Sequence, residues 1–150
     1  MDKVYLLEQL LEKLKALEAK ALAFAVEARD EARTGAPRAV NLAAATRARL
    51  EAAQADVAAV EGFRPAPVPK GGRIGVGAVV ELEDGSQGKT VFLAPAGAGV
   101  ELSGPGGDGF LQVVTPASPL GSALLGKRVG DVVETTVRGE LTEWEVVFAE

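Results

Sequence analysis

The stretch Lys3–Arg33 constrains the fold most, because it contains neither glycine nor proline. Nearly every residue in it is a good helix former. Apolar side chains recur along it at alternating steps of three and four, as in a heptad seam: Leu7, Leu10, Leu14, Leu17, Ala21, Phe24 and Ala28. The sequence therefore predicts one long helix with an apolar stripe along one side.

A helix breaker follows at Thr34–Pro37. Gly35 permits a positive φ, and Pro37 cannot continue the preceding helix. A second helix is predicted from about Arg38 to Val60, and its seam carries smaller side chains: Ala43, Thr46, Leu50, Ala53, Val57 and Val60. Two long helices joined by so short a turn fold back antiparallel. We therefore expect a coiled-coil helical hairpin at residues 1–62.

The second half of the chain reads differently. Residues 63–72 carry three prolines at alternate positions, which favours an extended linker. Short runs with strand character follow at residues 73–82, 90–94, 99–102, 110–115, 132–137 and 141–148. In the last run we expect the face that carries Trp144 to point into the core. The sequence predicts an α+β chain whose residues 73–150 form a small antiparallel sheet with one short helix.

Composition excludes several classes of function. The chain has no cysteine and no histidine, which removes disulfides, thiolate metal sites and the commonest general base. Its net charge of −5 argues against non-specific nucleic-acid binding, which needs a basic surface. We also expect no specific DNA binding. No apolar run approaches the length of a membrane span, and the first residues do not resemble a signal peptide. We expect a cytoplasmic protein.

The short helix is predicted from a compact pattern at residues 118–131. Ser118 is placed to cap the helix, and Pro119 occupies the first helical position, where a missing N–H costs nothing. Leu120, Ala123 and Leu124 stand at helical spacing and form one apolar face. Gly126 is placed to end the helix with a positive φ.

This stretch reads Ser-Pro-x-Gly-x-Ala-Leu-Leu-Gly-x-x-x-Gly-Asp. It resembles the C-terminal signature of the bacterial GreA/GreB family of transcription elongation factors. The order of hairpin, linker and small domain is also similar to that family. The resemblance implies an FK506-binding-protein-like small domain that docks on the rim of the largest subunit of RNA polymerase. It implies that the docking residues are Pro116, Ala117, Ser118, Pro119 and Leu120, although no carboxylate precedes Ser118 here as it often does in the family.

In cleavage-competent members the hairpin tip carries an acidic pair that holds a second Mg²⁺ in the polymerase active site, as two-metal hydrolysis requires. The equivalent tip here is Thr34, Gly35, Ala36, Pro37 and Arg38, and no acidic residue occurs between Thr34 and Leu50. The nearest acids are Glu27, Asp30 and Glu31. Asp30 and Glu31 diverge by about 100° around the helix. We therefore expect no catalytic residue, no metal site and no cofactor.

The sequence thus predicts a monomeric, non-cleaving regulator that occupies the secondary channel of bacterial RNA polymerase. As in the inhibitory (anti-Gre) homologues of this family, it competes with Gre-type cleavage and alters elongation or pausing. One alternative is a genuine cleavage stimulator that uses Glu27, Asp30 or Glu31. Two others are a peptidyl-prolyl isomerase, suggested by the small-domain fold alone, and an adaptor that self-associates through the Leu7–Phe24 seam.

Overall fold

The structure is a computed structural model that describes residues 1–107 and 109–150. These residues form two compact units: one combines Met1–Leu10 with Phe63–Glu150, and the other is Leu11–Gly62. No helix in the described part of the chain is both long enough and apolar enough to cross a membrane.

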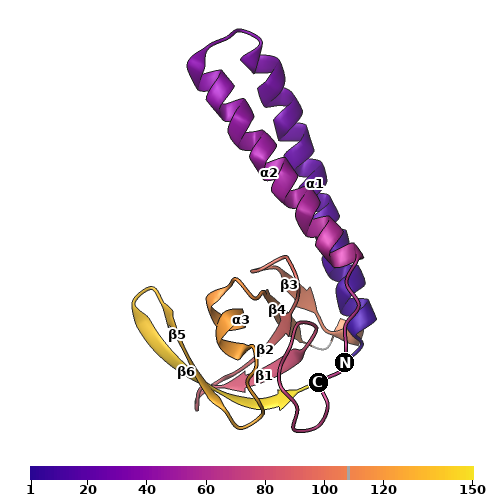
Figure 1. The fold of residues 1–150 in the computed structure, drawn as a ribbon, viewed down its shortest axis with the longest axis vertical. Helices are drawn as coiled ribbons and strands as arrows, with labels where there is room; N and C mark the ends of the chain where they lie inside the picture. The colour runs from indigo at the N-terminus through magenta and orange to yellow at the C-terminus, as the bar shows by residue number, and fades with distance from the viewer. Residues whose placement is uncertain (108) are drawn as a thin grey trace. The chain divides into compact units, whose positions relative to one another are not determined.

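The predicted hairpin is confirmed, with α1 at Lys3–Ala32 and α2 at Pro37–Glu61 (Figure 1). The Asp2 carboxylate caps the start of α1, since it accepts the N–H groups of Val4 at 3.0 Å and Tyr5 at 3.2 Å. Pro37 is the first residue of α2, in agreement with the helix breaker predicted at Thr34–Pro37.

The seam between these helices is only partly as predicted. Leu14, Ala28 and Val57 are buried, whereas Leu17 is 53% exposed and Phe24 is 55% exposed. The prediction is wrong at these two positions because the half-buried positions next along this side of α1 are Glu18 and Ala25. Leu17 and Phe24 stand one residue earlier, and one residue turns the side chain about 100° around the helix, away from α2.

A six-stranded sheet with the order β3-β4-β2-β1-β6-β5 forms the core of the second half. The strands are β1 Val79–Glu83, β2 Gly88–Leu93, β3 Glu101–Ser103, β4 Phe110–Val114, β5 Val132–Val137 and β6 Glu140–Ala149. A short 3₁₀ turn, η1 at Pro105–Gly107, precedes β4. The short helix α3, at Pro119–Leu124, lies on one face of the sheet (Figure 1). The predicted hairpin followed by a small sheet with one helix is confirmed.

One strand pairing differs from the prediction of an antiparallel sheet. β2 and β4 run parallel, while the other neighbouring strands are antiparallel, so the sheet is mixed. The difference follows from the chain path. After β2 the chain first forms the edge strand β3, and β4 then returns between β3 and β2, which gives β4 the direction of β2.

The Trp144 face of β6 packs in the core as predicted, together with Val146 from the same strand and Leu124 from α3. Phe148, on the same predicted face, is instead 41% exposed. The register between β1 and β6 shifts at this point, because Glu81 pairs with Phe148 while Leu82 pairs with Val146. The additional residue in β6 is a bulge, and a bulge interrupts the alternation of faces along a strand.

The predicted strand at residues 73–82 begins only at Val79. Ile74 pairs instead with the segment after α3, donating its N–H to the carbonyl of Lys127 at 2.7 Å and accepting the N–H of Gly126 at 2.8 Å. Gly77 turns the chain into β1 with a φ of +103°. A Cβ at Gly77 would lie 3.2 Å from both Phe63 and Pro65, so the start of the proline-rich segment packs directly against this turn.

The first turns of α1 belong to the same unit as the sheet. Leu6 and Leu10 are fully buried. Gln9 holds the edge strand β3 through two hydrogen bonds to one residue: its Nε2 donates to the carbonyl of Ser103 at 3.0 Å, and its Oε1 accepts the N–H of Ser103 at 2.8 Å. A side-chain amide thereby completes the backbone pairing of an edge strand, which otherwise presents unpaired groups.

Replacing Gln9 with alanine should destabilise the protein by about 1–3 kcal/mol, because both partly buried backbone groups of Ser103 lose their partner. Urea unfolding measures this change. Gln54→Ala, at an exposed position of α2, is the matched control and should leave the free energy of unfolding nearly unchanged. Equal stabilities of the two variants would contradict the assigned role of Gln9.

Candidate functional site

The hairpin tip is built from a helix stop followed directly by a helix start. Gly35 takes a φ of +77°, and its N–H donates to the carbonyl of Ala32 at 3.0 Å. The Thr34 hydroxyl donates to the carbonyl of Glu31 at 3.0 Å and accepts the N–H of Ala36 at 3.4 Å. All five predicted tip residues, Thr34, Gly35, Ala36, Pro37 and Arg38, are exposed.

The acids nearest the tip do not converge on one point. Asp30 forms an ion pair with Arg33 at 3.5 Å. Glu27 and Glu31 line a different place, an apolar hollow of about 380 Å³ along the hairpin that also contains Phe24 and Arg49. Within residues 1–107 and 109–150, no three acidic side chains come together in a way that would hold a metal ion.

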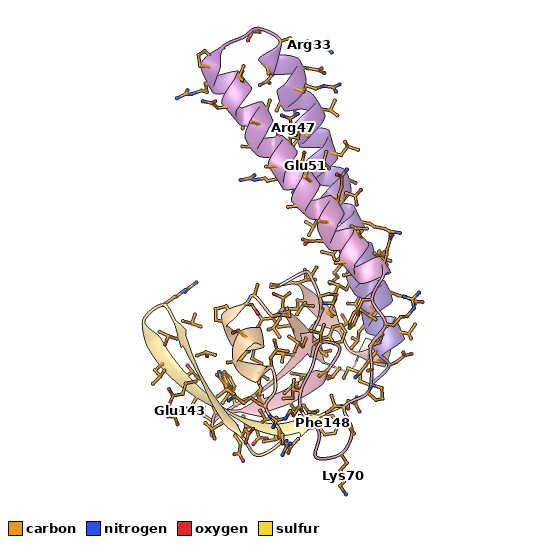
Figure 2. The ribbon with its side chains drawn as sticks, viewed as in Figure 1. Arg33, Arg47, Glu51, Lys70, Glu143 and Phe148 are labelled. Carbon is orange, nitrogen blue, oxygen red and sulfur yellow. The ribbon has the colours of Figure 1, made fainter. Side chains whose placement is uncertain are left out.

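Cationic side chains surround the rest of this end of the hairpin. A second apolar hollow, of about 360 Å³, is lined by Leu22, Val26 and Val40 and bordered by Arg29 and Arg47. Figure 2 shows Arg33 at the tip and Arg47 further along the hairpin. This end of the hairpin therefore presents arginines, apolar surface and the separate carboxylates of Glu27, Asp30 and Glu31.

The loop before α3 is fixed by the Ser118 hydroxyl. The hydroxyl donates to the carbonyl of Thr115 at 2.8 Å and accepts two backbone N–H groups, from Thr115 at 3.0 Å and from Gly121 at 3.3 Å. The predicted helix cap is confirmed, with Pro119 directly after it. Because every hydrogen-bonding position of the hydroxyl is used, the loop is held in one conformation while Pro116, Ala117 and Pro119 remain exposed.

Gly121 makes this close approach possible. A Cβ at that position would lie 1.9 Å from the carbonyl oxygen of Thr115, a distance that no side chain tolerates. The glycine of the signature at residues 118–131 is therefore required by packing of α3 against the preceding loop. The sequence pattern contains this glycine, but the need for glycine at this position becomes clear only from its contact with the Thr115 carbonyl.

A cavity of about 230 Å³ opens beside this loop. Its walls come from the start of α3, from β4 and from the β5–β6 hairpin, and include Pro119, Leu120, Val137 and Trp144. Lys89 of β2 also lines the cavity, with its Nζ 5.7 Å from the centroid of the Trp144 ring. Partial burial lowers the pKa of the Lys89 ammonium below its ordinary value.

Three of the five predicted docking residues, Ser118, Pro119 and Leu120, line this cavity, while Pro116 and Ala117 are exposed elsewhere on the loop. Sequence reasoning missed Lys89 and Val137, which come from strands far from the loop in sequence. The one available signal was Lys89 itself, a charged residue on the strand face that alternation assigns to the core.

Comparison with known proteins identifies a family and several similar proteins. Residues 68–150 match the family model described as "Transcription elongation factor, GreA/GreB, C-term". Over 77 residues the chain is 42% identical to the "Transcription inhibitor protein Gfh1" of Thermus aquaticus and to that of Thermus thermophilus. The matched segment covers 49% of this chain and 45% of each relative, so it spans less than half of their length.

Solved structures of similar proteins include the crystal structure of GreA factor homolog 1 (Gfh1) of Thermus thermophilus, which is 28% identical. That match covers 96% of this chain and 92% of the other, with a TM-score of 0.43. The crystal structure of Thermus aquaticus Gfh1 is 27% identical, with coverages of 95% and 92% and a TM-score of 0.44.

Replacing Gly121 with alanine should destabilise the protein by about 3 kcal/mol, because the new Cβ displaces the Thr115 carbonyl and the loop that carries it. Thermal or urea unfolding measures the loss. Ser122→Ala, at the next and exposed position of α3, should change the free energy of unfolding by less than about 0.5 kcal/mol. A Gly121→Ala variant as stable as Ser122→Ala would contradict the close approach.

Replacing Ser118 with alanine should cost about 1–2 kcal/mol, because the Thr115 and Gly121 N–H groups lose their acceptor. The measurement is again the free energy of unfolding. Ser118→Thr, which keeps the hydroxyl, should recover most of the loss. A threonine variant no more stable than the alanine variant would count against the hydroxyl as the source of the effect.

Proposed function

Because the chain belongs to the GreA/GreB family of transcription elongation factors, we propose that it binds bacterial RNA polymerase and regulates transcription without supporting transcript cleavage. In this proposal the small domain docks on the rim of the largest subunit, and the hairpin occupies the secondary channel. The protein acts as a monomer in the cytoplasm and competes there with cleavage-competent factors. The likeness to proteins named transcription inhibitors supports the inhibitory direction.

We propose a matching division of labour along the chain. Residues 1–62 form the arm that enters the channel, residues 63–72 form the linker, and residues 73–150 form the docking domain. The docking residues are Pro116, Ala117, Ser118, Pro119 and Leu120. The exposure of Pro116, Ala117 and Pro119 supports this assignment, because their side chains are available to a partner while the Ser118 hydroxyl keeps the loop in place.

The observation that carries the non-catalytic role is the chemistry of the tip. Retaining a second Mg²⁺ and orienting a water for phosphodiester hydrolysis requires carboxylates at the place that the tip reaches. Between Thr34 and Leu50 the chain has none, and Arg38 adds a positive charge that repels a cation. The protein is therefore not an enzyme and does not complete the polymerase site for cleavage.

The deciding experiment uses backtracked elongation complexes with an authentic Gre factor and Mg²⁺. This protein alone should release no RNA fragment, and in excess it should suppress the cleavage that the Gre factor stimulates. Failure to suppress at any concentration would contradict the polymerase assignment. Cleavage by the protein itself, lost in Asp30→Ala and Glu31→Ala variants, would favour the alternative of a cleavage stimulator that uses Glu27, Asp30 and Glu31.

A charge placed on the docking loop tests the docking residues. Ala117→Arg should raise the concentration needed for half-maximal suppression about tenfold, because a long charged side chain prevents close contact at the interface. Ser122→Arg carries the same change at an exposed position of α3 outside the loop and should bind normally. Equal binding of the two variants would exclude Ala117 from the interface.

A further inference from the structure

The two edges of the sheet differ in how much of their backbone is open to a partner. At one edge, β3 is three residues long, and Gln9 occupies both backbone groups of Ser103. At the other edge, β5 is six residues long, and among the described residues it pairs with β6 alone. Figure 1 shows the β5–β6 hairpin extending beyond the other strands. We propose that β5 pairs antiparallel with β5 of a second copy of this chain.

The side chains of β5 favour such pairing. Five of its six residues are valine or threonine, the β-branched types that suit strands, and the sixth is Glu134. Natural proteins protect exposed edges with lysine, proline or a bulge, and β5 carries none of these. Val132 is 57% exposed and Val137 is 60% exposed, so apolar surface is uncovered at both ends of the strand. The edge is therefore open in its backbone and in its side chains.

The ladder between β5 and β6 decides which backbone groups face the free edge. Val146 of β6 bonds through both its N–H and its C=O to residues 130–131, directly ahead of β5. Bonded positions recur at every second residue of an antiparallel ladder. They therefore continue at the even-numbered residues of β6 and at their partners, the odd-numbered residues of β5. The N–H and C=O groups of Glu134 and Thr136 are left directed away from β6, where a second strand can bind them.

The side chains also select the register of this pairing. A two-fold dimer places the same strand on both sides of its axis. If the axis passed through Glu134, two carboxylates would stand opposite each other, which is destabilising. With the axis at Thr135, Glu134 instead faces Thr136 of the second copy. Val133 then faces Val137, which joins a buried and an exposed valine in one apolar pair.

This register is also complementary in charge. Arg138 occupies the turn directly after β5. It is a diagonal neighbour of Glu134 of the second copy, and diagonal neighbours lie about 7–8 Å apart, within reach of a long side chain. For a hydrogen-bonded pair, the right-handed twist brings this diagonal closer than the one that joins the two Glu134 residues. The two-fold axis repeats the contact, so each dimer gains two pairs of opposite charge.

The expected dimer is weak. One short edge strand buries less than the roughly 1,200 Å² of a typical stable interface, so we expect a dissociation constant on the order of 100 μM. Below that concentration the protein is a monomer, as in the function proposed above. The inference goes beyond that function and does not depend on it.

Sedimentation velocity of the full-length protein from about 10 μM to about 500 μM measures the dimerisation. Thr136→Lys places an ammonium opposite Glu134 of the second copy and should tighten the dimer about fivefold. Thr136→Glu places a carboxylate there and should weaken it by a similar factor. Adding Glu134→Lys to the Thr136→Glu variant reverses both charges and should restore dimerisation.

Ser122→Lys and Ser122→Glu, at an exposed position of α3, are the matched controls for the change in net charge. They should leave the dissociation constant within about twofold of the original. Circular dichroism checks the fold of every variant. A protein that stays monomeric at the highest concentration would overturn the proposal. The proposal would also fail if both Thr136 variants shifted the dissociation constant in the same direction, or if the Ser122 variants shifted it equally.

Discussion

The approach of Gly121 to the Thr115 carbonyl is the contact on which the small domain depends most. It allows α3 to begin directly after β4, with Ser118 joining the two through its hydroxyl. Once α3 starts there, Leu124 reaches the core face of the sheet. The segment that follows α3 is then in place to pair with Ile74. One glycine thus connects the loop, the helix and the entrance to β1.

The same contact links stability to the candidate docking surface. A loop that exposes Pro116 and Ala117 loses conformational entropy when it binds a partner, unless it is already ordered. Here the Ser118 hydrogen bonds order the loop within the folded domain. Ser118 and Gly121 therefore fix the backbone conformation of the loop. The neighbouring residues carry the side chains that are exposed to a partner.

The sequence predicts the local elements well, because their signals are local. Helix-forming runs, the Gly35–Pro37 break and the Ser118 cap each depend on residues a few positions apart, and the structure confirms them. The errors concern contacts between distant segments. The parallel pairing of β2 with β4 and the bulge that exposes Phe148 are set by the neighbouring strand. Lys89 was missed for the same reason, since its significance depends on Trp144.

In the hairpin, the backbone fold of the tip does not depend on which charged side chains the tip carries. The turn at the tip requires a positive φ, which Gly35 adopts, and a residue that starts α2, which is Pro37. The Thr34 hydroxyl holds the turn through its hydrogen bond to Glu31, and no carboxylate side chain takes part in these contacts. Backbone geometry at the tip is therefore independent of the charges that a catalytic metal requires. On the function proposed above, removing carboxylates from such a tip leaves the shape that enters a channel intact. On that proposal, the difference from a cleavage factor lies in the side chains of the tip and not in its backbone.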